Sequence, residues 1–150
     1  MSALKAGKPI PEFTSVLQDG NVITSTELSK GKVILFFYPH DNTPTCTEEA
    51  CNLRDHHADF LKQGYRVYGV SPDSIRKHQN FIKKYNLPYS LISDPDLELI
   101  NKFGVWGPKK LFGREYDGVL RTTFILRDGI IKNVIDEVKA KSHAGQILNV

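Results

Sequence analysis

An uninterrupted apolar run, Val33-Ile34-Leu35-Phe36-Phe37-Tyr38, fits a strand that is covered on both faces of a sheet. From Thr45 to Gln63 the apolar positions follow helical spacing, and Gly64 provides a C-terminal stop. A second strand pattern, Tyr65 to Val70, comes directly after it. A strand, a helix and a strand in this order predict a βαβ unit, which places the chain in the α/β class.

Further elements extend this unit on both sides. Phe13–Val16 and Asn21–Thr24 flank Gln18-Asp19-Gly20 and predict a short N-terminal β-hairpin. The other expected elements are a helical turn over Thr26–Lys30, a helix from the Ser71–Ser74 cap to Asn86-Leu87-Pro88, a strand at Leu91–Ile92, a helix from Ser93-Asp94-Pro95-Asp96 through Phe103, a hairpin of Thr122–Leu126 and Ile130–Ile135 around Arg127-Asp128-Gly129, and a last helix from His143. This order predicts a mixed central sheet with helices on both faces, and a thioredoxin-like fold fits it.

Length and composition narrow the function classes. The 150 residues, without repeats or linkers, predict one domain over 1–150. The formal charge of +3, with no block of basic residues, gives no reason to expect nucleic acid as a partner. No apolar run approaches the ~20 residues of a membrane span. Met1–Lys8 lacks a hydrophobic signal core, so we expect a cytoplasmic protein.

Cys46 and Cys51 are the only two cysteines. In a cytosolic chain a permanent disulfide is not expected, and two nearby cysteines indicate transient redox or metal chemistry. Cys46 follows Pro44 near the expected helix start, where free backbone N–H groups and the hydroxyls of Thr43 and Thr47 favour a thiolate. On an ideal helix, Cα atoms five positions apart lie roughly 8.6 Å from each other. A disulfide requires them within about 7 Å. The two cysteines can therefore bond only if the helix start unwinds.

Simpler interpretations remain open at this point. A cysteine at a helix start can be a small buried hydrophobic residue. The spacing of the cysteines and histidines is not that of a structural zinc site, so no metal and no other cofactor is expected. His56 and His57, beside Asp55 and Asp59, are expected to be surface or partly packed residues. Glu48 and Glu49, in the first helical turn, are expected to be capping or surface charges.

Two motifs give the chain a more specific interpretation. The segment Phe37–Asp55 contains Pro39, Thr43 and Cys46 in the P-x-x-x-T/S-x-x-C pattern and resembles a peroxiredoxin, most closely the bacterioferritin comigratory protein or Q-type branch. The segment Trp106–Ile125 resembles the stretch that supplies the active-site arginine of that family, which here is Arg121. The resemblance runs from about Gly7 to the C-terminus.

The resemblance implies a role for each residue. Cys46 would attack a hydroperoxide and become a sulfenic acid. Thr43 would hydrogen-bond the thiolate and the peroxide, and the backbone N–H groups of Thr45 and Cys46 would hold the peroxide. Arg121 would stabilise the thiolate and the charge that builds on the leaving oxygen, and Pro39 would shield the sulfenate from solvent. Cys51 would then form an intramolecular disulfide with Cys46. Many relatives have glycine at the position of Thr45, so this β-branched residue is expected to make unwinding harder.

The implied enzyme is a thioredoxin-dependent peroxidase acting on hydrogen peroxide and organic hydroperoxides. A thioredoxin or glutaredoxin-type dithiol would reduce the disulfide, and a monomer would suffice because both cysteines lie in one chain. One alternative is a general thiol–disulfide oxidoreductase without peroxidase activity, which would need neither Thr43 nor Arg121. Another is a non-enzymatic module that binds a metal or a partner.

Overall fold

The computed structural model describes residues 3–150, so Met1 and Ser2 of the expected signal-free N-terminus lie outside the described residues. The strands are β1 (Thr14–Leu17), β2 (Val22–Thr24), β3 (Lys32–Phe37), β4 (Tyr65–Ser71), β5 (Ser90–Ser93), β6 (Trp106–Leu111), β7 (Arg114–Val119), β8 (Thr122–Arg127) and β9 (Ile130–Ile135). The helices are α1 (Ser25–Leu28), α2 (Pro44–Asp55), α3 (His57–Lys62), α4 (Ile75–Tyr85), α5 (Glu98–Lys102), a 3-10 turn (Ala140–Ser142) and α6 (His143–Leu148).

Seven strands form one mixed sheet in the order β2-β1-β5-β4-β3-β8-β9. The central strand β3 runs parallel to β4 and antiparallel to β8. β1 and β2 form the expected N-terminal hairpin, and β8 and β9 form the expected C-terminal one. Val33 to Tyr38 are all buried, as the continuous apolar run predicts for a strand covered on both faces.

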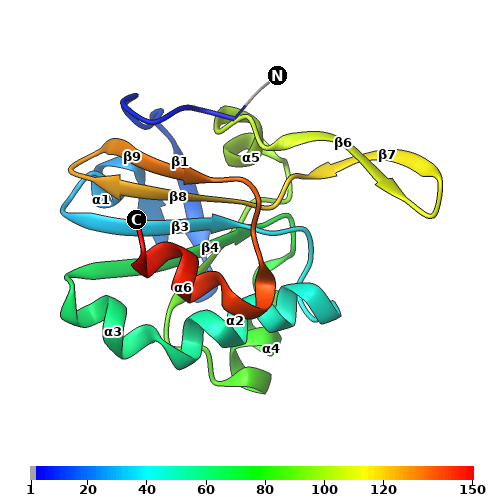
Figure 1. Ribbon diagram of the computed structural model, residues 1–150, viewed down its shortest axis with the longest axis horizontal. Helices are drawn as coiled ribbons and strands as arrows, with labels where there is room; N and C mark the ends of the chain where they lie inside the picture. Colours follow the sequence, from blue (N-terminus) through cyan, green and yellow to red (C-terminus); the bar gives the residue numbers. More distant parts are fainter. Residues whose placement is uncertain (1–2) are drawn as a thin grey trace.

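The two faces of the sheet carry separate cores (Figure 1). Helices α1 and α5 pack on one face, where Leu28 and Phe103 meet Phe37 and Phe124. Helices α2, α3, α4 and α6 cover the other face, where Cys46 packs within the second core. The expected mixed sheet with helices on both faces is confirmed.

The helix expected over Thr45–Gln63 is two helices, so that expectation was wrong in its length. The break falls at His56, whose backbone has φ −108° and ψ 11°. The Nδ1 atom of His56 lies 3.0 Å from the carbonyl oxygen of Asn52, the acceptor that would continue the helical ladder. A side chain that binds the backbone in this way ends α2 and lets α3 begin in a new direction.

The helix expected to open at Ser93–Asp96 begins later, at Glu98. Asp94 caps it from a distance, because its carboxylate accepts hydrogen bonds from the N–H groups of Leu99 and Ile100 at 3.1 and 2.8 Å. The intervening residue Leu97 has a φ of 60°. The chain therefore makes a turn before the helix starts.

A two-stranded hairpin of β6 and β7 was not expected from the sequence. It extends away from the body of the molecule, with its tip at Phe112 and Gly113 (Figure 1). Both tip residues have positive φ, 52° and 77°, as a two-residue hairpin turn requires. A sequence pattern does not predict this hairpin, because proline, here Pro108, is rare within strands and phenylalanine is rare in a turn with positive φ.

Candidate active site

Cys46 lies in the first turn of α2 and is 2% exposed. Thr43 is the N-cap residue and Pro44 occupies the first helical position, where its missing N–H costs nothing. The first turn of a helix has free N–H groups and the positive end of the helix dipole, both of which favour negative charge in its neighbourhood. The expected helix start is confirmed.

Arg121 connects the sulfur to a buried carboxylate. It stands between β7 and β8, and its Nη2 donates a hydrogen bond to Cys46 Sγ at 3.2 Å. Its Nη1 donates to Glu49 Oε1 at 2.6 Å. Burial lowers the pKa of Arg121, but Glu49 and Cys46 raise it by more, so the guanidinium stays charged. The fold thus brings a fixed cation from 75 residues along the chain against the sulfur.

Glu49 is fully buried, at 0% exposure, so the expectation of a surface or capping charge was wrong for this residue. Glu48 beside it is exposed. Burial raises the pKa of Glu49 to about 7, although Arg121 acts in the opposite direction. Among the described residues, Glu49 Oε2 has no hydrogen-bond partner. Glu49 faces the interior because Arg121 and α6 cover it on the side where an isolated helix would meet water.

His143, at the start of α6, lies behind Glu49. Its Nδ1 is 2.8 Å from Gln146 Oε1, an acceptor, so Nδ1 carries the proton. Its Nε2 then accepts from the Thr123 hydroxyl at 2.6 Å and has no proton to give to Glu49 Oε2, which is 3.6 Å away. Burial is the main reason why the pKa of His143 is lowered. This neutral imidazole accounts for the unpaired carboxylate oxygen.

Lys109 supplies a second cation near the sulfur. It extends from β6 and donates from Nζ to the carbonyl oxygen of Val119 at 2.9 Å. Burial and the positive charge of Arg121 lower the pKa of Lys109, while Cys46 raises it. Sequence reasoning missed Lys109 and His143 as site residues. An unexpected hairpin brings Lys109 to the site, and no local pattern marks His143.

The other expected peroxide-binding residues surround the same helix start. The Thr43 hydroxyl donates to the carbonyl oxygen of His40 at 3.2 Å and makes no cap bond to α2. Thr45 is exposed in the first turn of α2. Pro39 lines a groove of about 280 Å³, together with Trp106, Tyr116 and Val119 of the β6–β7 hairpin. The structure therefore collects Pro39, Thr43, Thr45, Cys46 and Arg121 in one region.

Cys51 lies on α2 with Cys46, is partly buried and, like Cys46, is a free thiol. Burial raises the pKa of its thiol. Helix α2 is unbroken between the two cysteines, so the two sulfurs are kept apart as the spacing predicts. Further along α2, the Tyr89 hydroxyl donates to the carbonyl oxygen of Ala50 at 2.7 Å. The Asn52 side chain donates to the carbonyl oxygen of Lys141 and accepts from the backbone N–H of Ala144 in α6. These contacts hold the helix from Ala50 onward.

One cluster has the composition of a metal site. Asp41, Asp73 and His78 place possible ligand atoms within 4.8 Å of one another. The Asp41 carboxylate already bonds to His78 and Tyr38, and the Asp73 carboxylate accepts from the Ser71 hydroxyl and the Asp41 backbone N–H, so these groups form a hydrogen-bond network. We therefore assign no metal to it. His56 and His57 are partly packed.

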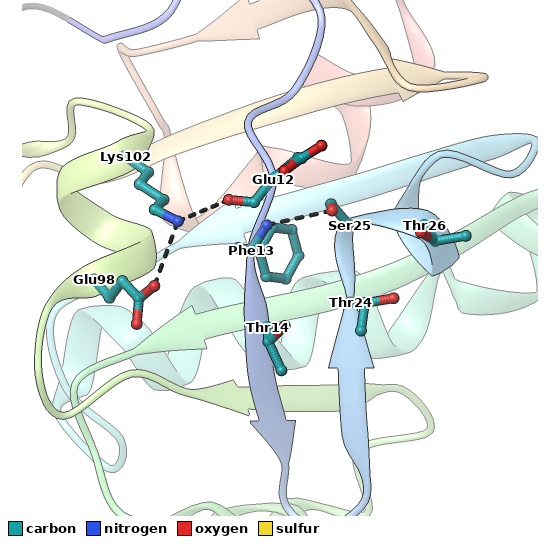
Figure 2. A pocket seen from close by; sticks show the side chains of 8 residues that line it. All are labelled: Glu12, Phe13, Thr14, Thr24, Ser25, Thr26, Glu98 and Lys102. Atoms are coloured by element: carbon teal, nitrogen blue, oxygen red, sulfur yellow. Dashed lines mark hydrogen bonds and ion pairs between the residues drawn. The ribbon is translucent and has the colours of Figure 1, made fainter.

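A separate hollow of about 460 Å³ lies between β1, β2 and α5 (Figure 2). Its lining includes Lys102, Thr14, Thr24 and Ser25. Lys102 donates to the carbonyl oxygen of Glu12 and forms an ion pair with Glu98. It holds none of the expected site residues. Among the described residues, no helix is long and apolar enough to cross a membrane.

The chain is similar to known proteins over nearly its full length. Residues 6–134 match the AhpC/TSA family. The chain is 40% identical over 147 residues to the protein named putative peroxiredoxin bcp from Coxiella burnetii, covering 97% of both. It is 39% identical over 150 residues to peroxiredoxin Bcp of Escherichia coli strain K12, covering 99% of this chain and 96% of that one.

The similarity extends to solved structures. The bacterioferritin comigratory protein of Xanthomonas campestris superposes with a TM-score of 0.83 at 32% identity, covering 91% of this chain and 88% of that one. The matched family segment includes Cys46, Cys51 and Arg121 and ends before His143.

Proposed function

The chain belongs to the AhpC/TSA family, in its Bcp or Q-type peroxiredoxin branch, and is a thiol-dependent peroxidase, and from that premise we propose that Cys46 is the residue that reacts with peroxide and Cys51 the residue that resolves it. A hydroperoxide is the substrate and a thiol such as thioredoxin is the reductant. The observation that carries the proposal is the 3.2 Å hydrogen bond from Arg121 Nη2 to a nearly buried Cys46 sulfur.

In the first step the Cys46 thiolate attacks the terminal oxygen of the hydroperoxide. A sulfur–oxygen bond forms, the oxygen–oxygen bond breaks, and the leaving alkoxide or hydroxide takes up a proton. Arg121 is fixed by Glu49 before the reaction, so it stabilises charge on the thiolate and on the leaving oxygen without reorganising. Thr43 and the N–H groups of Thr45 and Cys46 bind the peroxide, and Pro39 shields the product from water.

In the second step the Cys51 sulfur attacks the sulfur of the sulfenic acid. A disulfide forms and the hydroxyl leaves as water. Since both residues lie in α2, the turns between Pro44 and Ala50 must unwind first. The Tyr89 hydroxyl binds the carbonyl oxygen of Ala50 and so opposes unwinding that reaches that residue. Thr45 adds resistance because a β-branched residue restricts the backbone.

A dithiol of the thioredoxin or glutaredoxin type then reduces the disulfide and takes the two electrons. Organic hydroperoxides join hydrogen peroxide in the proposed substrate range, and the Xanthomonas campestris relative is described by its alkyl peroxide reduction activity. The proposed unit is a monomeric single domain, 1–150, without nucleic acid or membrane as partner. We also propose a cytoplasmic location, since two cysteines that alternate between thiols and a disulfide need a reducing compartment in which to be recycled.

The test is a coupled assay with hydrogen peroxide, thioredoxin, thioredoxin reductase and NADPH, run on wild type, Cys46→Ser and Cys51→Ser. The wild type is expected to consume NADPH, and Cys46→Ser to lose all peroxide-dependent turnover. Cys51→Ser is expected to react once and then stop, with turnover restored by an added small thiol.

Two results would contradict the proposal. Activity retained in Cys46→Ser would show that another group reacts with peroxide. Turnover of a disulfide substrate by the wild type, with no peroxide turnover with any dithiol tried, would favour the general thiol–disulfide oxidoreductase instead.

A further inference from the structure

The loop before α2 is anchored by one buried side chain, Asp41. Its side chain is 2% exposed. Asp41 Oδ1 accepts from the Tyr38 hydroxyl at 2.5 Å, and Oδ2 lies 2.7 Å from His78 Nδ1. Its backbone N–H donates to Asp73 Oδ2 at 2.7 Å. Both the side chain and the backbone of one loop residue are thus tied to three other positions.

The partner, His78, comes from α4 and is completely buried. Its Nε2 lies 3.0 Å from the carbonyl oxygen of Ile92, which can only accept, so Nε2 carries a proton. Its Nδ1 faces a carboxylate oxygen, and a bond between them needs one proton. The pair therefore shares one proton between Nδ1 and Oδ2 and leaves neither buried group unpaired.

The position of Asp41 connects this pair to the reacting sulfur. Only residues 38–43 join the end of β3 at Phe37 to the start of α2 at Pro44. Asp41 is in the middle of that connection, two residues before the N-cap Thr43. The Thr43 hydroxyl also bonds to His40, the neighbour of Asp41. An anchor at Asp41 therefore fixes where α2 begins and where Cys46 points.

We propose that the Asp41–His78 pair is a positioning element that holds the Pro39–Thr43 loop in the conformation from which Cys46 reacts with hydroperoxide. The proposal rests on the proposed function, because it takes Cys46 as the reacting residue. Neither side chain touches the sulfur in the bonds described. Loss of the pair lets the loop and the first turn of α2 leave the reactive conformation, so the peroxide step slows while the chemistry of Cys46 is unchanged.

Two amide substitutions at His78 separate positioning from simple packing. In His78→Asn the amide nitrogen can take the place of Nδ1 and keep a donor on Asp41. In His78→Gln the amide reaches toward the carbonyl oxygen of Ile92 and leaves Asp41 Oδ2 without the donor that Nδ1 provides. A packing role alone would not distinguish them in this direction, since asparagine fills less of the buried space than glutamine.

The measurement is stopped-flow fluorescence of Trp106, the single tryptophan, which lines the groove beside Pro39 and His40. Hydrogen peroxide is varied, so that the phase that depends on its concentration is separated from later phases. His78→Gln is expected to lower the second-order rate constant roughly tenfold, the effect of one lost hydrogen bond to a charged group. His78→Asn is expected to stay within about threefold of wild type. Urea unfolding of each variant gives the folded fraction, and rates are compared per folded molecule.

Asp41→Asn and Asp41→Ala provide a second comparison that does not depend on how the His78 variants fold. The amide of Asp41→Asn can accept from Tyr38 and donate to His78, so its rate constant is expected near that of wild type, with Asp41→Ala roughly tenfold lower. Equal rate constants within each pair of variants would overturn the proposal. A wild type with no peroxide-dependent phase would instead remove the assignment of Cys46, and the proposal with it.

Discussion

The guanidinium of Arg121 is bound to the carboxylate of Glu49 at 2.6 Å, at a point where Glu49 is completely buried. This ion pair fixes the direction of the second guanidinium nitrogen, which meets Cys46 Sγ at 3.2 Å. The contact with Arg121 offsets only part of the cost of burying the charged Glu49, so the pKa of Glu49 is raised to about 7 and the group is partly neutral near neutral pH. The pair is thus a fixed support for charge at the sulfur.

Replacing Arg121 should slow the peroxide step strongly. Arg121→Met removes both donors, and we expect the second-order rate constant with hydrogen peroxide to fall about a hundredfold or more, as for the loss of one preorganised donor. Arg121→Lys should be intermediate, because one ammonium cannot bond to both Cys46 and Glu49 in the same geometry. Stopped-flow measurement gives the rate constants. A rate constant for Arg121→Met within threefold of wild type would show that the arginine does not support the reaction.

Glu49 should make stability depend on pH. Its carboxyl has a usual pKa of 4.5 that burial raises to about 7 in the folded protein. Between these values the folded state binds the proton and the unfolded state does not, so the stabilisation is complete below about pH 4.5 and is lost as pH rises through about 7. The free energy of unfolding should fall by on the order of 3 kcal/mol over this window through this group alone.

The matched variant for this prediction is Glu49→Gln, which keeps an acceptor for Arg121 but does not titrate. Urea unfolding of both proteins at several pH values isolates the contribution of Glu49 as their difference. We expect the wild type to lose stability relative to Glu49→Gln as pH rises from 4.5 to 7. A difference that is constant, or that changes in the opposite direction, would contradict the raised pKa.

Removing the hydroxyl of Tyr89 should make disulfide formation faster. Tyr89→Phe deletes the bond to the carbonyl oxygen of Ala50, worth about 1 kcal/mol, and so makes unwinding of α2 easier. We expect the rate of Cys46–Cys51 bond formation to rise about fivefold, which corresponds to that free energy. The peroxide-independent phase of Trp106 fluorescence measures it. Tyr85→Phe is the control, because its hydroxyl makes no bond to α2 among the described residues. An equal change of this rate in Tyr89→Phe and Tyr85→Phe would contradict the explanation.

Gly69 in β4 should not tolerate a side chain. A Cβ there would lie 2.7 Å from both Leu91 Cδ2 and Phe36 Cζ, two buried groups on neighbouring strands. We expect Gly69→Ala to lower the free energy of unfolding by about 1–3 kcal/mol, the usual cost of overpacking. Gly145→Ala in α6 meets nothing within 4 Å and should raise it by about 0.5–1 kcal/mol. Thermal or urea unfolding checks both, and a stable Gly69→Ala would mean that the core can rearrange there.

The sequence was sufficient to predict much of the fold, because several signals were strong and local. The buried run of β3, the hairpin turns after Leu17 and Arg127, and the Ser74 cap of α4 each predict one element, and all are present. The break at His56 could not be predicted, since it depends on which way one imidazole turns. The β6–β7 hairpin was missed because its turn and its proline contradict the usual strand rules.

The active site, too, could be predicted from the sequence only in part. Cys46, Cys51 and Thr43 lie in one short segment, and the structure collects Pro39, Thr43, Cys46 and Arg121 around the start of α2. Glu49 was misjudged because exposure on a helix depends on what packs against it, and here Arg121 and His143 do so from distant segments. A single sequence contains no signal for such contacts.

The central claim is that Cys46 accepts the oxygen and Cys51 removes it, and one measurement tests it most directly. Wild type and Cys51→Ser are each treated with one equivalent of hydrogen peroxide, then with a reagent that captures sulfenic acids, and analysed by mass spectrometry of whole protein and peptides. We predict a captured sulfenic acid at Cys46 in Cys51→Ser, and in the wild type a mass lower by two hydrogen atoms, with one peptide-mapped bond between Cys46 and Cys51. A sulfenic acid at Cys51, or no bond between the two cysteines in the oxidised wild type, would contradict the account.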